Sequence, residues 1–233
     1  MKFIKLFENF NKSEIEDICR KYEIENYTIN PDGSIDVDGD VNLYYLKLTK
    51  LPLKFNKVFG DFDCSNNELT SLDGCPKEVG GDFYCNNNKL TSLDGSPKEV
   101  GSDFNCDNNE LTSLDGCPKE VGDFNCYNNK LTSLDGSPNY SGYFDCNNNK
   151  LTSLEGCPEV NGDFYFHDNP IKRIVKLFNE DIKIYLEYQE TYNFLRKDCK
   201  IIKHLLIEAI KDFNEYYNKQ VELPKKIEGY TYI

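Results

Sequence analysis

A phenylalanine recurs every 20 or 21 residues through the middle of the chain, and this repeat constrains the fold more than any other feature. Cysteine, asparagine and two leucines recur around it at the same step. A fixed period of this length is typical of a solenoid, in which each short coil packs against its neighbours. The repeating phenylalanines are Phe62, Phe83, Phe104, Phe124, Phe144 and Phe164.

A weaker coil precedes these six. Val41, Leu43 and Leu48 stand 21 residues before the first full set of repeating positions, although Leu46 occupies the place of the asparagine. The sequence therefore predicts about seven coils over residues 40–174.

The repeat reads F-x-C-x-x-N-x-L-x-x-L and resembles the leucine-rich repeat pattern L-x-L-x-x-N-x-L, with phenylalanine and cysteine in its first two apolar positions. Its length and its Leu-Thr-Ser-Leu stretch are similar to the short bacterial type and to small repeat proteins of phage and environmental bacterial genomes. The resemblance implies an α+β repeat protein, a right-handed leucine-rich-repeat solenoid with one parallel β-sheet. It also implies a concave strand face that binds other proteins.

Bacterial effector proteins of this type carry a ubiquitin ligase domain after their repeats. Here Cys199 lies in a much shorter tail, in the sequence Lys-Asp-Cys-Lys. That activity is therefore not expected for this chain.

Alternation within one coil predicts a short strand. Phe83 and Cys85 point inward, while Tyr84 and Asn86 point outward. The roughly 10 residues that lead to the next coil contain glycine and proline, so the return path cannot hold an α-helix and must run extended or in turns. The loss of one residue in the later coils falls in this return path.

Both ends of a solenoid need a cap because the terminal coils have a neighbour on one side only. Residues 1–39 predict an N-terminal cap of two short helices and a hairpin. Phe3 and Phe7 belong to the first helix, and a capping box of Ser13 and Glu16 opens the second. Residues 30–33, Asn-Pro-Asp-Gly, predict the hairpin turn.

Residues 175–233 predict a C-terminal helical cap. One helix is indicated by Ile182 and Leu186, and a second by a longer apolar series. This series is Ile201, Leu205, Ile207, Ile210 and Phe213.

The repeating cysteines are predicted to fill small apolar positions inside the coils. Neighbouring parallel strands lie about 4.8 Å apart, which is too far for an unstrained disulfide between successive coils. A stack of metal-bound thiolates is the alternative, but paired ligand spacings are absent from the sequence. Without a secretion signal, the ten cysteines favour reduced thiols in the cytoplasm.

Asparagine and aspartate also form columns along the coils. The inward asparagine that follows each cysteine is predicted to pair with backbone groups left free by the turn. Stacked carboxylates repel unless they are paired, so Lys77, Lys98 and Lys119 are candidate partners, and calcium is the alternative. The two acidic columns are Asp61, Asp82, Asp103, Asp123 and Asp163, and Asp73, Asp94, Asp115, Asp135 and Glu155.

Charge indicates the kind of partner. The chain has a net charge of −13, and residues 60–170 alone contain 6 lysines and 20 acidic residues. An acidic surface steers basic partners and repels phosphate, so the sequence predicts a protein partner with a basic surface and excludes nucleic acid on this face. No apolar run reaches the roughly 18 to 20 residues that a membrane helix needs, and lysines interrupt the N-terminus before a signal sequence can form. A cytoplasmic protein that begins at Met1 is expected, with no membrane contact.

The outward positions of the strands vary between coils, as expected of a recognition surface. Tyrosine supplies contact area with a polar tip and is the predicted anchor, while the acidic residues steer or pair. A solvated face with incidental tyrosines is the alternative. The predicted partner-binding residues are Tyr84, Tyr127, Tyr165, Asn105, Asp107, Asn125, Asp145, His167 and Asp168.

Two other functions stay open. The phage-like resemblance suggests a structural component of a virion or other assembly. An enzyme would need its active site in residues 175–233, yet the sequence contains no Ser/His/Asp set, phosphate-binding glycine loop or metal quartet. The sequence thus predicts no catalytic residues, no metal and no cofactor.

Overall fold

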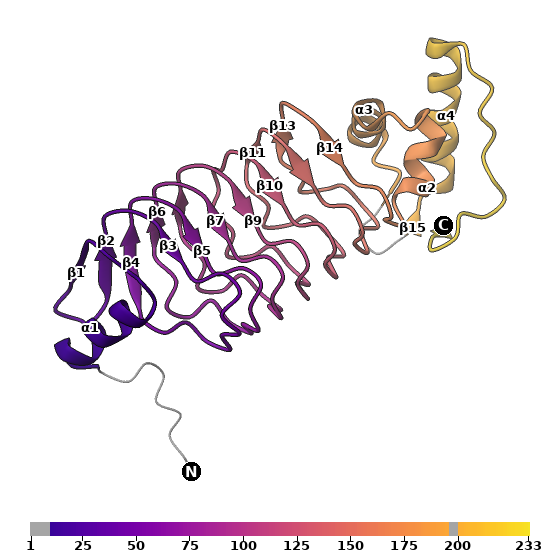
Figure 1. Ribbon diagram of the computed structural model, residues 1–233. Coiled ribbons are helices and arrows are strands. Elements are labelled where there is room, and N and C mark those ends of the chain that lie inside the picture. The colour runs from indigo at the N-terminus through magenta and orange to yellow at the C-terminus, as the bar shows by residue number, and fades with distance from the viewer. Residues whose placement is uncertain (1–9, 196–199) are drawn as a thin grey trace.

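The chain forms an elongated stack of coils with a helix at its N-terminal end and a group of helices at the other (Figure 1). The computed structural model describes residues 10–195 and 200–233. It shows a parallel β-solenoid of about six turns with C-terminal helices. Among the described residues, no helix is long and apolar enough to cross a membrane.

The six inward phenylalanines, with Val41 in the first coil, start the strands of a seven-stranded parallel sheet, in which one strand comes from each predicted coil. Each pair joins equivalent residues, for example Phe83 with Phe104, so the sheet is in register throughout. The one-residue shortening of the later coils leaves this register intact, as predicted. Its strands are β3 (Val41–Asn42), β5 (Phe62–Asp63), β7 (Phe83–Tyr84), β9 (Phe104–Asn105), β10 (Phe124–Asn125), β12 (Phe144–Asp145) and β14 (Phe164–Tyr165).

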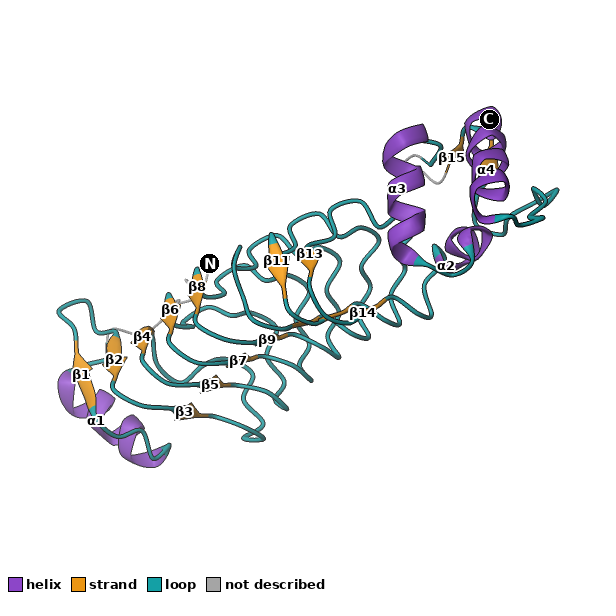
Figure 2. Ribbon diagram, turned by 90° about the horizontal axis from the view of Figure 1, so that it is seen from above, coloured by secondary structure: helices purple, strands orange, loops and turns teal. Residues whose placement is uncertain are grey.

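The return path is extended, as predicted, but it also builds further sheets that the sequence analysis missed. Figure 2 shows the strands of this path in a second row, opposite the row of β3, β5, β7 and β9. A five-stranded sheet has the order β1-β2-β4-β6-β8, and β11 pairs with β13. The new strands are β4 (Phe55–Val58), β6 (Glu78–Val79), β8 (Glu99–Val100), β11 (Tyr140–Ser141) and β13 (Glu159–Val160).

This second row is interrupted after β8, where the period changes from 21 to 20 residues. In the longer coils the amide of Gly101 donates to the carbonyl of Val79. In the first shorter coil the amide of Gly122 donates to Ser102, just as Ser102 donates to Gly81, but the Gly101 bond has no equivalent there among the described residues. The missing residue therefore removes a rung from the return sheet, while the strands at the other side of the coil stay paired.

The N-terminal cap contains helix α1 (Lys12–Lys21) and a hairpin of β1 (Tyr27–Ile29) and β2 (Ile35–Val37). Asn11 and Glu14 form the capping box, so the predicted box of Ser13 and Glu16 is wrong. Asn11 has the same spacing to Glu14, and it begins the helix one residue before Lys12. The first predicted helix, with Phe3 and Phe7, lies outside the described residues.

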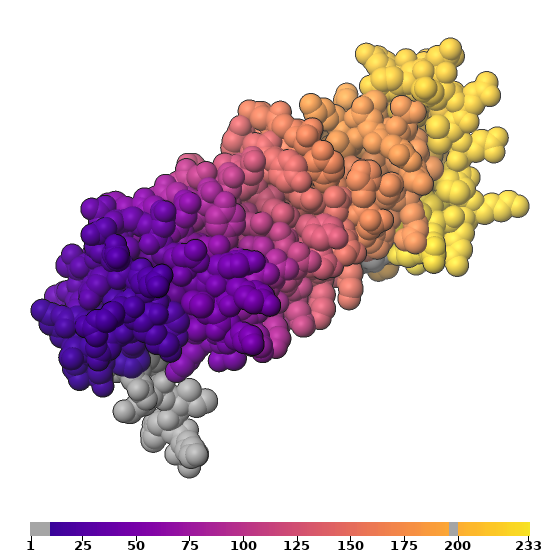
Figure 3. Space-filling view, viewed as in Figure 1, coloured from indigo at the N-terminus to yellow at the C-terminus, as the bar shows by residue number. Residues whose placement is uncertain are grey.

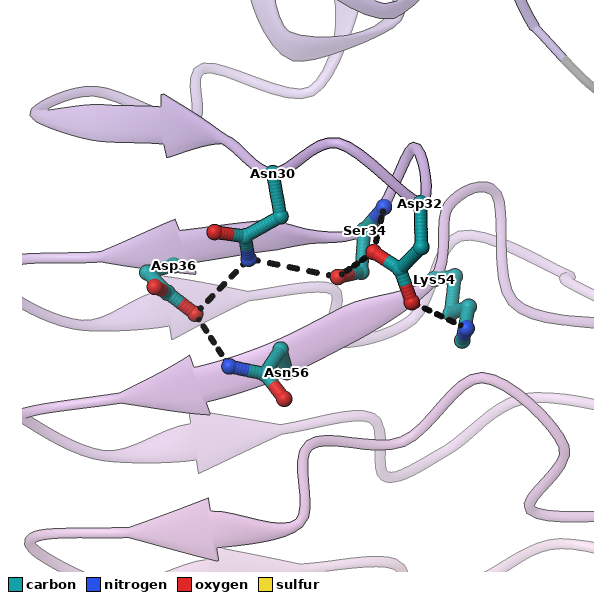
Figure 4. Close-up of polar contacts among 6 residues, drawn as sticks. All are labelled: Asn30, Asp32, Ser34, Asp36, Lys54 and Asn56. Carbon is teal, nitrogen blue, oxygen red and sulfur yellow. Dashed lines mark hydrogen bonds and ion pairs between the residues drawn. The ribbon is translucent and has the colours of Figure 1, made fainter.

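The predicted hairpin is confirmed, and its second strand pairs with β4 in parallel. Polar side chains fix this junction (Figure 4). Asp36 accepts hydrogen bonds from the amides of Asn30 and Asn56 at 3.1 and 2.7 Å. Asp32 forms an ion pair with Lys54 at 2.7 Å. The hairpin is thereby joined to the first return segment of the solenoid.

The core consists of the inward ladders. The phenylalanines from Phe62 to Phe144 are 0% exposed, as are the five cysteines and the leucines that repeat with them. Successive phenylalanine rings from Phe62 to Phe144 lie 5.1 to 5.8 Å apart. Burial of apolar area and aromatic stacking therefore act between every pair of coils.

The C-terminal helices enclose a second aromatic cluster of Phe178, Tyr185, Phe194 and Phe213. It is joined to the last coils by a hydrogen bond from Tyr230 to the carbonyl of Thr152. Its elements are α2 (Lys172–Val175), a 3₁₀ turn η1 (Lys176–Phe178), α3 (Ile182–Tyr192), β15 (Lys200–Ile201), α4 (Lys203–Tyr217) and β16 (Thr231–Tyr232).

Both predicted C-terminal helices exist, but the second apolar series was assigned incorrectly at two positions. Ile201 is buried in strand β15, before the helix begins. Ile207 is 46% exposed, because Leu206, Ala209 and Phe213 form the buried face of α4.

Candidate binding surface

The predicted site residues lie on what we call the strand face, the outward positions of the seven-stranded sheet and the turn that follows each strand. The surface of the molecule is long, and residue numbers increase along it from one end to the other (Figure 3). The predicted residues come from coils that begin at Phe83, Phe104, Phe124, Phe144 and Phe164. They therefore lie on one row of the solenoid, although they differ widely in exposure.

The first outward position of each coil, directly after the repeating phenylalanine, mainly shapes the turn. Asn105, Asn125 and Asp145 each accept a hydrogen bond through a side-chain oxygen from the amide two residues ahead, at 3.0, 3.0 and 2.8 Å. Such turns are typical of asparagine and aspartate. These three predicted binding residues are therefore held in place by their own backbone.

At the third outward position, directly before the inward asparagine, the backbone is left-handed in every coil. The sequence pattern was not interpreted in this way. Asp168 has φ of +56°, and the equivalent asparagines have φ between +51° and +54°. Asparagine and aspartate tolerate this conformation better than most residues. Three of these side chains also form a ladder, in which Asn148 donates to Asn128 and Asn128 donates to Asn108, both at 2.6 Å.

The three predicted tyrosine anchors are not equivalent. The hydroxyl of Tyr84 donates to Asp82 at 2.6 Å, and that of Tyr165 donates to Asp163 at 3.3 Å. The carboxylate of Asp82 raises the pKa of Tyr84, and that of Asp163 raises the pKa of Tyr165. Tyr127 is 38% exposed and is the most accessible of the three.

Tyr143 belongs to the same surface and was not predicted as a site residue. Its ring lies 5.4 Å from that of Tyr165, and its hydroxyl donates to Asp145 at 3.2 Å. Burial and the nearby carboxylate raise its pKa to about 12. The sequence signal was the single tyrosine that interrupts the aspartate column.

His167 and Asp168 are exposed at the C-terminal end of the strand face. The Nδ1 atom of His167 lies 2.9 Å from the Nζ atom of Lys172, and its ring stacks on Phe166. The acidic face therefore ends beside cationic side chains. Lys172, Arg173 and Lys176 line a hollow of about 440 Å³ with Asp168, Asn169 and Pro170.

A larger hollow of about 570 Å³ lies on the other row, over β4, β6 and β8. Lysine and glutamate side chains alternate along it, and Lys57 pairs with Glu78. The sequence pattern did not indicate this hollow, because it did not indicate the sheet beneath it.

Asp107 is the exception among the predicted steering groups, because it is only 9% exposed. Its carboxylate accepts hydrogen bonds from the side-chain amides of Asn108 and Asn125. Burial raises its pKa above the usual range of aspartate. It therefore acts inside the turn rather than as an exposed charge.

Replacing Asp107 by asparagine, the residue of the equivalent positions 86 and 147, should stabilise the protein at pH 7 by up to about 1 kcal/mol. A raised folded-state pKa means that the ionised carboxylate opposes folding. The difference in free energy of unfolding between variant and wild type is therefore largest above the folded-state pKa. It disappears below the unfolded-state pKa of about 4. Urea unfolding at pH 3.5 and pH 7 measures it, and equal differences at both values would contradict the assignment.

The inward asparagines have the predicted role. Asn88 donates to the carbonyls of Cys64 and Cys85 and accepts from the amide of Leu69, at 2.9 to 3.1 Å. The same set recurs at Asn67, Asn109, Asn129, Asn149 and Asn169. This column joins neighbouring coils through their backbone groups.

Backbone amides stabilise the first acidic column. Asp61 accepts from the amide of Asp82 at 2.8 Å, and Asp82 accepts from that of Asp103 at 3.0 Å. The ladder begins at Asp40 and ends at Tyr143. The suggested pairing with lysine is not seen for Lys119, which donates to the carbonyls of residues 136 and 137.

Inter-coil ion pairs occur elsewhere, between Lys89 and Glu68 and between Lys130 and Glu110. Within residues 10–195 and 200–233, no three or more His, Cys, Asp or Glu side chains are grouped in a way that could hold a metal ion.

The cysteines occupy the interior, as predicted, and the nine that the structure describes are all free. Burial raises the pKa of the Cys85, Cys106 and Cys126 thiols well above the ordinary value. Cys157 is only partly buried, with a pKa of about 11.

Native protein should therefore react slowly with Ellman's reagent at pH 8, because thiolate formation and access are both suppressed. In a Cys199→Ser variant we expect at most about one thiol per chain, at Cys157, to react before unfolding, and nine to react in urea. Adding Cys157→Ser should remove the reaction that precedes unfolding. Rapid reaction of several thiols in the folded protein would contradict the buried ladder.

No protein-family profile matches this sequence, and neither the curated proteins nor the solved structures contain a significant match.

Proposed function

We propose that this protein is a binding module of the leucine-rich repeat kind, with right-handed coils, and that its strand face docks a protein partner with a basic surface. The observation that carries the proposal is the exposed ring of Tyr127 among polar side chains that hydrogen bonds already hold in place. Fixed side chains lose little conformational entropy on binding, and an exposed tyrosine supplies contact area.

Charge supports the same partner class. Residues 60–170 hold 20 acidic residues against 6 lysines. On the strand face Asp145 and Asp168 remain at least partly accessible, whereas Asp107 is buried. Such a surface accelerates the encounter with a basic partner, and the effect weakens as salt screens it.

The test is a quantitative pull-down from host lysate with the wild type and a Tyr127→Ala variant. Tyr140→Ala is the matched control, since Tyr140 is 39% exposed but lies in β11 on the return path. A partner bound through the strand face should be retained by the wild type and by Tyr140→Ala. Its affinity for Tyr127→Ala should fall at least about tenfold, as for an interface hot spot.

Raising the salt concentration from about 0.05 to 0.3 M should weaken the same complex. Equal retention by the Tyr127→Ala variant, or retention that does not change with salt, would contradict docking on the acidic strand face.

A further inference from the structure

The first coil departs from the repeat at the turn after its strand. Later coils carry asparagine or aspartate at the second of these turn positions and asparagine at the third, for example Asn66 and Asn67, and one of them has a tyrosine, Tyr127, at the first. The first coil has instead Tyr44, Tyr45 and Leu46, which are 50%, 67% and 44% exposed. We call these three residues the first-coil patch.

The fold does not explain this substitution. Tyr45 has φ of +57°, the left-handed conformation that the other coils assign to asparagine or aspartate. A bulky side chain is disfavoured there, so asparagine would suit the local backbone better. The rings of Tyr44 and Tyr45 lie 5.9 Å apart at the surface. Three consecutive exposed apolar side chains are typical of an interaction site rather than of a solvated turn.

The patch lies beside an open sheet edge. Strand β3 is the last strand of the seven-stranded sheet, and the hairpin of the N-terminal cap extends the other row. Figure 2 shows β3 at the end of its row. Among the described residues, no strand pairs with the outer edge of β3. An unpaired edge can pair with a strand of another chain.

Charges around the strand are self-complementary. Asp38 and Asp40 precede β3, and Lys47 and Lys50 follow the patch, all of them exposed. In a two-fold arrangement, antiparallel edges bring the acidic end of each copy to the basic end of the other. The same aromatic patch then meets itself at the centre.

We propose that a second copy of this chain docks on the first-coil patch with two-fold symmetry and forms a dimer through the edges of β3. This interface is separate from the Tyr127 region, so the dimer would present two strand faces. The experiment also separates two other occupants: an unrelated protein, and the chain's own residues 1–9, which contain Phe3, Ile4, Leu6 and Phe7.

Sedimentation velocity of the full chain between about 1 and 100 µM tests the proposal. The wild type should shift from monomer to dimer with concentration. A Tyr44→Ser/Tyr45→Asn variant restores the residues of the next coil and should stay monomeric, with an unchanged or higher unfolding temperature. Lys47→Glu should weaken the dimer at least about tenfold. Tyr216→Ser is the control, since Tyr216 is 80% exposed on α4, and it should dimerise like the wild type.

A wild type that stays monomeric throughout this range would overturn the proposal. So would a dimer that survives Tyr44→Ser/Tyr45→Asn. Comparing the wild type with a chain that lacks residues 1–9 tests whether these residues cover the patch instead. A monomeric wild type that dimerises only after this deletion would show that residues 1–9 occupy the patch instead of a second copy.

Discussion

Replacing Asn109 by leucine should lower the free energy of unfolding by about 3 to 5 kcal/mol, although the two side chains are similar in size. The side-chain amide of Asn109 donates to the carbonyls of Cys85, Cys106 and Asp107 at 3.1 to 3.2 Å. Its oxygen accepts from the amide of Leu90 at 3.0 Å. Leucine leaves the buried amide of Leu90 without a partner, which costs roughly 1 to 3 kcal/mol. It also removes one of the two donors of each carbonyl, since Asn88, Asn129 and the amide of Asn87 supply the other.

Urea unfolding followed by circular dichroism measures this loss. Glu110→Gln is the matched control one residue away, because it removes only the exposed ion pair with Lys130. It should cost less than about 1 kcal/mol. If both substitutions cost the same, the inward asparagine column would not be what joins neighbouring coils.

The repeat made the solenoid predictable because the inward residues are both identical and equally spaced. Once Phe83 and Phe104 occupy equivalent places, the strands must pair in register. The return sheet was not predictable in this way. Apart from Phe55–Val58, the strands of the return path, such as Glu78–Val79, are two residues long and too short to show alternation. They pair only because the opposite side of each coil is already stacked.

The binding surface was only partly predictable. Sequence alternation placed Asn125 and Tyr84 outward. It could not show that Asn125 accepts a hydrogen bond from a backbone amide of its own turn, or that the hydroxyl of Tyr84 donates to Asp82. The left-handed position was detectable in principle. An asparagine that recurs at the same turn position in five successive coils, from Asn66 to Asn148, indicates positive φ, because a variable recognition surface would not require it.

Residue spacing alone also led to wrong assignments in the two caps. Ser13 with Glu16 and Asn11 with Glu14 satisfy the same spacing rule, and the spacing alone does not show that the helix begins after Asn11. Ile207 fits a helical apolar series, yet α4 has only one side against the aromatic cluster. Such assignments require the neighbouring element and not only the segment itself.

Phe104→Ala should also cost about 3 to 5 kcal/mol, and it should change how the solenoid unfolds. The Phe104 ring is 0% exposed and lies between the rings of Phe83 and Phe124, at 5.1 and 5.4 Å. Removing it leaves a cavity in the middle of the stack. Because each coil contacts only its neighbours, the cavity weakens the connection between the coils on either side.

Phe164→Ala is the matched control at the end of the ladder, where the ring is only partly buried and contacts Phe144 and Phe166. It should cost about half as much and leave the unfolding transition sharp, because only terminal contacts are lost. Phe104→Ala should instead broaden the urea transition or divide it into two, and hydrogen exchange should show which half opens first. A single sharp transition with equal losses for both variants would mean that stability is shared by all coils and not transmitted from neighbour to neighbour. The ring ladder would then fill the core without setting the cooperativity of the fold.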